Sequence, residues 1–94
     1  MIYKWDEAKR IANMVKHGQD FEAARRFDWA IALQWPDIRK DYGETRWLAY
    51  GKIDGRLHLL VFTGRNNQTR VISLRKANAK EQATYGNQID PQLT

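Results

Sequence analysis

The chain is short, basic and free of cysteine, with 94 residues, a net charge of +5 and 43% hydrophobic residues. This size fits one domain with a single modest core, and the hydrophobic fraction excludes a disordered chain. Without cysteine there are no disulfides or thiolate metal sites, and two histidines cannot build a zinc site without several carboxylates, so we expect no metal and no cofactor.

The first elements in the chain are predicted to be a short strand and a helix. Residues 2–5 have the composition of a strand, and Asp6 is a suitable N-cap for the helix that follows. Gly18 is expected to end that helix. Its apolar residues recur at the spacing of one helix stripe, which we expect to be buried: Ala8, Ile11, Ala12 and Val15.

A second, shorter helix is predicted over residues 21–27, with Asp20 as its N-cap. Phe21, Ala24 and Phe27 would face the core. From Trp29 the pattern changes to alternation, which predicts a strand that Pro36 ends.

The next elements are predicted to form an antiparallel meander. Residues 46–53 and 56–63 flank Asp54-Gly55, a strong signal for a two-residue hairpin turn. A second turn over residues 64–68 leads into a strand over residues 69–74. Residues 77–85 read as a last helix, which we expect Gly86-Asn87 to end.

This order of elements predicts an α+β domain in which helices pack mainly on one face of an antiparallel sheet. We expect residues 1–88 to form the domain and residues 89–94 a flexible tail. No stretch approaches the roughly 20 apolar residues of a membrane span, and the first residues do not form the apolar region of a signal peptide. We therefore expect a cytoplasmic protein that does not contact a membrane.

The positive charge is concentrated at the two ends of the sequence. Residues 1–27 carry a net charge of +2, residues 28–55 carry −1, and residues 56–94 carry +4. We expect the two ends to meet in one positive face, although a solvated basic surface is an equal alternative. The segment from Thr69 to Ala77 ends in an Arg-Lys pair after an earlier arginine, and such groups most simply bind phosphate.

Several local patterns occur together along residues 3–86. They are Trp5-Asp6-Glu7-Ala8-Lys9, Asn13, Lys16-His17-Gly18, Phe21-Glu22-Ala23-Ala24, Phe27-Asp28, Asp41-Tyr42-Gly43-Glu44-Thr45-Arg46, Gly51, Gly55-Arg56 and Arg70-Val71-Ile72-Ser73-Leu74-Arg75-Lys76-Ala77. In this order and spacing, the patterns resemble one family, the BrnT toxins of bacterial toxin–antitoxin systems. Leu74 stands where that family usually has alanine.

The resemblance implies a RelE-like fold and a ribonuclease that arrests translation. It implies a metal-independent reaction, in which the 2′-hydroxyl of the RNA attacks the adjacent phosphorus and the protein supplies a base, an acid and positive charge. It also implies a partner antitoxin, BrnA, whose ribbon-helix-helix region binds operator DNA. The toxin would then contact DNA only through a hetero-oligomer with the antitoxin.

Arg70 and Arg75 are the first candidates for contacts to the reacting phosphate. Their separation of five residues would place them on opposite faces of a regular strand, so both reach one site only if the strand ends or bends between them. Alternatively, one of them merely pairs with Glu81 or a surface acid. Lys76 would add a further phosphate contact.

His17 is the candidate base or acid, although a histidine that caps the helix is an equal alternative. Its position at a helix C-terminus favours the cation. Lys9 and Lys16 share a helix face and would extend the phosphate track.

Glu81 and Tyr85 lie four residues apart on the last predicted helix. Glu81 would orient His17 or Arg75, and Tyr85 would stack on a base or bind a phosphate, unless both serve only to cover the sheet. Trp29, Trp35 and Trp47 are interpreted as core residues, and His58 as structural. The competing functions are a non-catalytic nucleic-acid-binding module or co-repressor, and a protein whose basic face docks an acidic partner.

Overall fold

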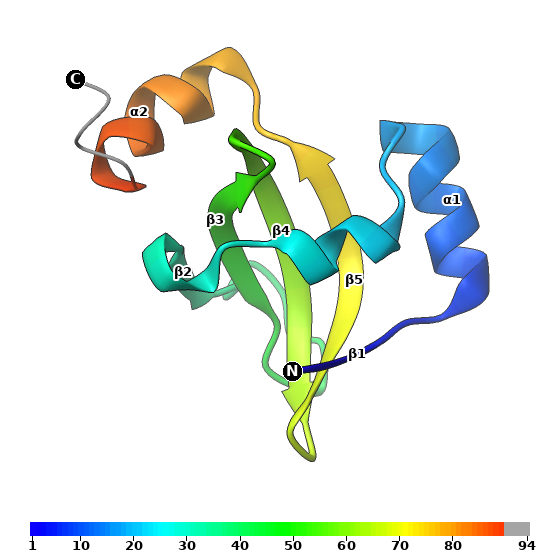
Figure 1. Cartoon of the computed structure of the whole chain (residues 1–94). Coiled ribbons are helices and arrows are strands. Elements are labelled where there is room, and N and C mark those ends of the chain that lie inside the picture. Colours follow the sequence, from blue (N-terminus) through cyan, green and yellow to red (C-terminus); the bar gives the residue numbers. More distant parts are fainter. Residues whose placement is uncertain (90–94) are drawn as a thin grey trace.

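The computed structural model describes residues 1–89, which form an α+β domain around a five-stranded sheet (Figure 1). The strands lie in the order β1-β5-β4-β3-β2. The elements, in chain order, are β1 (Ile2–Lys4), α1 (Glu7–His17), η1 (Phe21–Arg26), η2 (Trp29–Ile31), β2 (Leu33–Pro36), β3 (Trp47–Ile53), β4 (Arg56–Arg65), β5 (Gln68–Lys76) and α2 (Ala79–Ile89).

The predicted meander is confirmed, and both of its turns have two residues. Asp54 and Gly55 join β3 to β4 with φ angles of 50° and 80°, the left-handed pair that a type I′ turn requires. Asn66 and Asn67 join β4 to β5 with φ angles of 52° and 61°. Asparagine tolerates this conformation, which lets the second hairpin extend further than predicted.

The two faces of the sheet carry separate hydrophobic clusters. On one face, the 3₁₀ segments η1 and η2 cover β3, β4 and β5 (Figure 1). Phe21, Ala24 and Phe27 are buried there, as predicted. Phe27 lies directly on Gly51, where an added Cβ would come within 2.4 Å of the ring. Only glycine therefore lets the aromatic ring pack this closely on β3.

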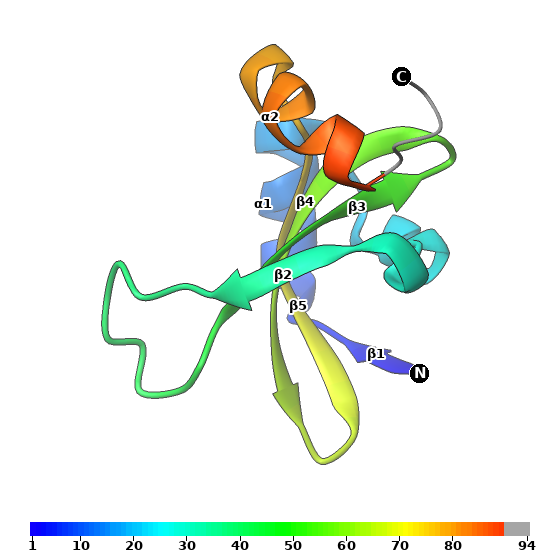
Figure 2. The same cartoon turned by 90° about the vertical axis from the view of Figure 1, so that its left-hand side faces the viewer.

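The opposite face carries the second cluster, in which Tyr85 of α2 packs near Tyr50 and Trp35. Figure 2 shows the η segments on one side of the sheet and the connection between β2 and β3 on the other. The α+β class is confirmed, but the helices are divided between the faces and one edge. The sheet is mixed, because β1 pairs parallel to β5.

Helix α1 lies along the edge of β5, next to the short strand β1 (Figure 1). Asp6 and Gly18 cap it as predicted: the Asp6 side chain accepts from the Lys9 N–H, and Gly18 has a φ of 69°. The prediction that its apolar stripe is buried is wrong. Asn13 is the buried residue of this helix, whereas Ile11 is 54% and Val15 84% exposed.

Asn13 explains this orientation. Its amide nitrogen donates to the Leu74 carbonyl at 2.8 Å, and its amide oxygen accepts from the Leu74 N–H at 3.2 Å. The strand β1 ends too early to pair with this part of β5. The side chain therefore satisfies backbone groups that a neighbouring strand would otherwise bind, and the polar side of α1 must face inward.

Several predicted elements differ from the structure in their boundaries or type. The strand predicted from Trp29 begins only at Leu33, because the Asp28 side chain caps a 3₁₀ turn at its start. The segment from Asp20 is also 3₁₀ rather than α-helical. Helix α2 continues through Gly86 to Ile89, and residues 90–94 of the predicted tail lie outside the described part. No helix in residues 1–89 has the length and hydropathy to cross a membrane.

Candidate active site

A β-bulge in β5 decides where the two candidate arginines point. Val71 pairs with Phe62 and Ser73 with Val61, so Ile72 is an extra residue opposite the Val61/Phe62 step. The extra residue shifts the alternation by one. Arg70, opposite Thr63, and Arg75, opposite Leu59, consequently lie on the same face of the sheet. The strand stays paired through both arginines. The bulge is therefore the bend that was expected if both arginines were to reach one site.

A cavity of about 330 Å³ opens on this face, between α1 and β5. Its lining combines apolar and basic side chains, and none of its lining residues is acidic. It is lined by Lys9, Ala12, Asn13, Lys16, His17, Arg46, Ile72 and Ser73. The cavity joins α1 to β5, and its cations come from the first and middle parts of the chain: Lys9 and Lys16 from α1, and Arg46 from the start of β3. The predicted residues Lys9, Lys16 and His17 are brought together here.

Arg46 is the lining residue that the sequence reasoning left without a role. Its guanidinium carbon lies 4.1 Å from the centroid of the Tyr42 ring, and its Nε is buried without a hydrogen-bond partner in the described residues. A buried N–H group without a partner is costly, and an anion in the adjacent cavity would satisfy it. The signal was present in the sequence, because Arg46 ends the Asp41–Arg46 pattern at the start of β3.

Asp37 holds the connection that carries Arg46. Its buried carboxylate accepts hydrogen bonds from the Arg39 guanidinium at 2.7 and 2.8 Å and from the Tyr42 hydroxyl at 3.1 Å. Its backbone N–H donates to the Arg46 carbonyl at 2.8 Å. The hydrogen bonds from Arg39 hold the pKa of Asp37 far below its usual value, so the carboxylate stays charged and fixes Tyr42 beneath Arg46.

His17 sits at the end of α1 with part of its ring buried against the cavity. Burial lowers its pKa below the ordinary 6.5, and the positive charges of Lys16 and Arg75 lower it further. This direction is opposite to the expectation that the helix terminus favours the cation, because burial and two neighbouring cations favour the neutral ring. The ring is neutral at pH 7 and can accept a proton.

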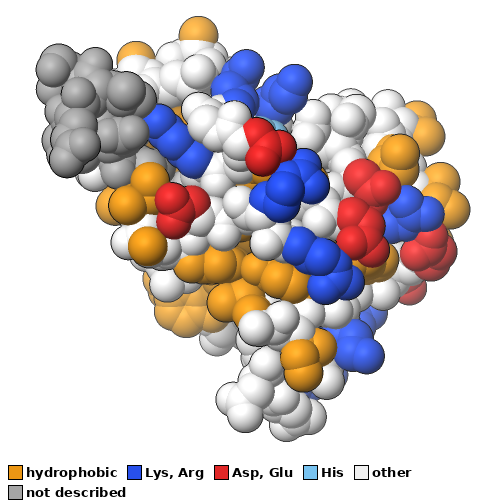
Figure 3. Space-filling model, viewed as in Figure 1, with side chains coloured by type: hydrophobic (Ala, Val, Ile, Leu, Met, Phe, Trp, Pro, Cys, Tyr) orange, Lys and Arg blue, Asp and Glu red, His pale blue; other side chains and the backbone are white. Residues whose placement is uncertain are grey.

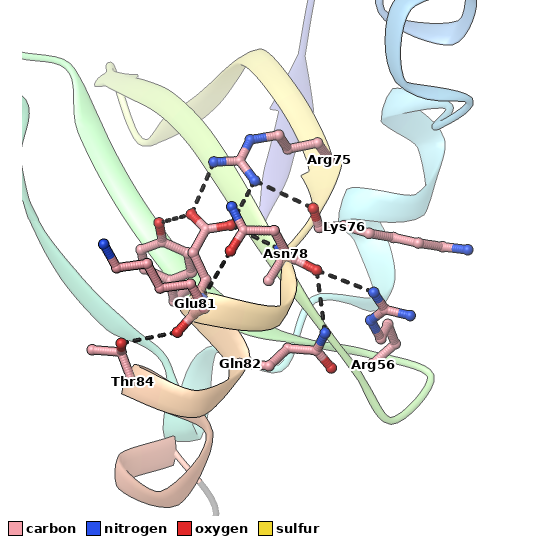
Figure 4. A network of polar contacts seen from close by, with 10 residues as sticks. Arg56, Arg75, Lys76, Asn78, Glu81, Gln82 and Thr84 are labelled. Atoms are coloured by element: carbon pink, nitrogen blue, oxygen red, sulfur yellow. Dashed lines mark hydrogen bonds and ion pairs between the residues drawn. The ribbon is translucent and has the colours of Figure 1, made fainter.

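Arg75 and Glu81 form a second polar cluster on the same face (Figure 4). The two guanidinium nitrogens of Arg75 donate to the two oxygens of Glu81 at 2.7 and 2.9 Å. Tyr50 donates its hydroxyl proton to the same carboxylate, and Asn78 and Glu81 bond reciprocally at the start of α2. The ion pair with Arg75 lowers the pKa of Glu81 to about 2.

Glu81 was expected to orient His17 or Arg75, and the structure shows it orienting Arg75. The alternative that Arg75 forms an ion pair with Glu81 is therefore confirmed. Both Glu81 oxygens already accept hydrogen bonds, which leaves little capacity for accepting a proton from a substrate. Burial, with the Glu81 charge, raises the pKa of Tyr50, so its hydroxyl stays protonated and holds the carboxylate.

The remaining candidates lie outside the cavity. Arg70 is exposed and, in the described residues, makes no ion pair. Lys76 pairs opposite His58 and so points to the other face, away from Arg75 (Figure 4). Tyr85 stacks on Tyr50 with ring centroids 4.4 Å apart, so one side of its ring is already covered. His58 is buried and bonds the Arg56 carbonyl, in keeping with a structural role.

One family model matches most of the chain. This model, described as "Ribonuclease toxin, BrnT, of type II toxin-antitoxin system", matches residues 5–81, from the start of the α1 segment to the carboxylate that holds Arg75. A comparison with curated proteins gives no match. A toxin of this class has RNA as its target and an antitoxin protein as its partner. The chain belongs to the BrnT family of ribonuclease toxins from type II toxin–antitoxin systems.

Proposed function

We propose that this protein is a metal-independent endoribonuclease whose reaction takes place in the cavity between α1 and β5. The observation that carries the proposal is the lining of that cavity, where Lys9, Lys16 and Arg46 surround a neutral His17 with no carboxylate among them. Such a lining suits a phosphodiester, because fixed cations stabilise the charge that develops on the phosphoryl oxygens.

In the proposed reaction, the 2′-oxygen of the RNA forms a bond to the adjacent phosphorus while the bond from phosphorus to the 5′-oxygen breaks. His17 accepts the proton of the 2′-hydroxyl, and solvent water donates a proton to the departing 5′-oxygen. The products are a 2′,3′-cyclic phosphate and a 5′-hydroxyl end. Lys9, Lys16 and Arg46 hold the phosphate, while Arg70 and Arg75 extend positive charge along the same face.

Arg75 acts in this proposal from a fixed position. The bidentate pair with Glu81 leaves its side chain at a defined place on the sheet, 32% exposed to solvent. Glu81 is therefore a positioning residue, and Tyr85 supports it through the stack on Tyr50. Lys76, on the other face, would contact only RNA that wraps around the edge of the sheet.

We further propose that cleavage inhibits translation and that a BrnA-like antitoxin with a ribbon-helix-helix region neutralises the toxin. Operator DNA would be bound by that antitoxin, and the toxin would join it as part of a hetero-oligomer. Family membership supports the antitoxin partner, and the basic face supports an acidic surface on it.

The test is cleavage of purified RNA by the purified protein in the presence of EDTA. We expect the unchanged protein to cleave, and Arg46→Ala to reduce kcat/KM by roughly a hundredfold, because the cavity loses an unpaired cation. Arg26→Ala is the matched control: it removes an equal charge that pairs with exposed Asp54. Activity that returns only with added metal would contradict the mechanism, and RNA binding without cleavage would assign the non-catalytic module instead.

A further inference from the structure

The outer side of α1 presents an apolar stripe to solvent. Ile11 and Val15, one turn apart, are 54% and 84% exposed, and the alanines beside them are exposed as well. Figure 3 shows hydrophobic side chains gathered at the edge of the molecule over α1. The spacing of Ala8, Ile11, Ala12 and Val15 is that of a helix face made to pack, yet no described element covers it.

The orientation of α1 is fixed by contacts on its other side. Asn13 bonds to Leu74 and to the Gln19 carbonyl, and Arg10 donates to Asp20 at 3.1 Å. Turning the stripe inward would break each of these bonds and leave the Leu74 backbone groups without partners. The exposed stripe is therefore the resting arrangement of the helix, held in place by the polar contacts opposite.

The stripe is continuous with the cavity. Ala12 belongs to both, and Lys9 and Lys16 stand between the apolar residues and the cavity mouth. Neither lysine pairs with a carboxylate in the described residues. A segment lying on the stripe would therefore bring its flank directly over two unpaired cations.

We propose that the stripe is the docking surface for the antitoxin, and that the occupant is an amphipathic helix with carboxylates along one flank. This inference rests on the proposed function, because it assigns the partner to the edge of the same site. The apolar side of that helix packs on Ile11 and Val15, and its carboxylates reach Lys9 and Lys16. Docking in this position neutralises the cations that would hold the RNA phosphate.

A second copy of the chain is a poorer occupant on electrostatic grounds. In a twofold-symmetric pair of antiparallel α1 helices, each flank meets the same flank of the other copy. Lys9 and Lys16 of the two copies would then face one another, and like charges across an interface are unfavourable.

The first test measures binding of the product of the reading frame beside this chain's gene, purified and used as the probe. Ile11→Asp and Val15→Asp are each expected to weaken binding at least roughly a hundredfold, because a carboxylate would be buried against apolar side chains and beside the carboxylates of the partner. Ile38→Asp is the matched control, because Ile38 is also apolar and is 89% exposed in the connection after β2.

Binding of the probe within a few fold by all three variants would overturn the proposal, as would failure of the unchanged chain to bind it. If the free protein had the mass of a dimer and Val15→Asp had the mass of a monomer, the stripe would be assigned to a second copy of the chain instead. Circular dichroism of each variant checks that α1 is still formed, so that lost binding reports the surface and not the fold.

A second measurement locates the contact directly. The chain has no cysteine, so Val15→Cys and Ile38→Cys each create a single thiol. In the complex, we expect maleimide labelling at position 15 to slow by at least roughly tenfold while labelling at position 38 continues at its free rate. Equal labelling at position 15 with and without the partner would overturn the docking site.

The docking proposal and the ribonuclease proposal fail separately. Ile11 and Val15 lie outside the cavity, so their variants are expected to cleave RNA at the rate of the unchanged chain while escaping the antitoxin. Loss of antitoxin binding in a chain that never cleaves RNA would support the docking surface and contradict the enzyme. Normal cleavage with unaltered antitoxin binding would do the reverse.

Discussion

Arg46 and Arg75 lie on the same side of the sheet and use the same functional group in opposite ways. Arg75 is committed to both oxygens of Glu81, whereas the Nε of Arg46 has no described partner and its guanidinium rests on an aromatic ring. A paired guanidinium has a fixed position, and its partner offsets part of its charge. An unpaired one retains its full attraction for an anion, which makes Arg46 the stronger phosphate ligand of the two.

The Arg75–Glu81 pair makes stability depend on acid pH. The folded pKa of Glu81 is about 2, below the ordinary 4.5, so its stabilisation is present above pH 4.5 and is lost as pH falls toward 2. We expect Glu81→Gln to lower the free energy of unfolding by about 2 kcal/mol at pH 7. Urea unfolding at pH 7 and pH 3 measures this, and the gap to the unchanged chain must narrow at the lower pH.

His17 should leave its signature in the pH dependence of cleavage. Because its pKa is lowered from the ordinary 6.5, the neutral base is the major form above that pH, and activity should fall as the ring is protonated at lower pH. We expect His17→Gln to lose roughly a hundredfold or more in rate and to lose this acid limb. Single-turnover rates from pH 4.5 to 8 measure both.

His58→Gln is the control for that profile. His58 is buried and bonds the Arg56 carbonyl, so its loss should leave the acid limb in place. If the fall of the rate at low pH stayed in His17→Gln and disappeared in His58→Gln, the titrating group would be His58. That result would contradict His17 as the base.

The sequence predicted which residues lie at the cavity better than it predicted their protonation states. Lys9, Lys16 and His17 follow from a helix face and its terminus, and all three line the cavity. The pKa of His17 depends on burial and on Arg75, which belongs to another element, so helix position alone gave the wrong sign. Arg46 was missed because the Asp41–Arg46 pattern marks the residue but does not show which cavity its side chain faces.

At the scale of elements, α1 shows how a polar contact can override hydrophobic patterning. The stripe was visible in the sequence and is real, but the pattern does not say which side meets the protein. That choice depends on the unpaired edge of β5, which exists because β1 spans only Ile2–Lys4. By contrast, the caps at Asp6, Asp20 and Gly18 were predictable because each involves neighbours within a few residues.

Asn13 should therefore matter more to stability than the apolar residues of its own helix. We expect Asn13→Ala to lower the free energy of unfolding by about 2–4 kcal/mol, because Leu74 and Gln19 lose their hydrogen-bond partners. Val15→Ala should change it by less than about 0.5 kcal/mol, because the side chain is already exposed. Urea unfolding compares the two, and a larger effect at Val15 would contradict the described orientation.

At the scale of the whole molecule, the fold brings together charge that the sequence keeps apart. The basic excess lies in residues 1–27 and 56–94, and the packing of α1 against β5 joins them on one face. The charge distribution was compatible with that meeting but equally with a solvated basic surface. The division of helices between two faces and an edge was not, because it depends on which strand edge stays unpaired.

The salt dependence of RNA binding should report how many cations on this face contact phosphates. When the logarithm of the binding constant is plotted against the logarithm of the salt concentration, each neutralised phosphate of a single strand contributes about −0.7 to the slope. Contacts from Lys9, Lys16, Arg46 and Arg70 predict a slope of about −3. The double variant Lys9→Gln, Lys16→Gln should lower its magnitude by about 1.4, whereas Arg26→Ala should leave the slope unchanged. Fluorescence anisotropy across a salt series measures it.

The bulge at Ile72 lets two arginines an odd number of residues apart serve one surface. In a regular strand, residues five apart lie on opposite faces, so Arg70 and Arg75 share a face only because Ile72 has no partner of its own on β4. Deleting Ile72 would leave a spacing of four in a regularly paired strand, with the arginines still opposite Thr63 and Leu59. Straightening the strand while keeping Ile72 would instead turn one arginine to the other face. A chain of this family that lacks both the bulge and the extra residue would therefore present the same surface to its RNA.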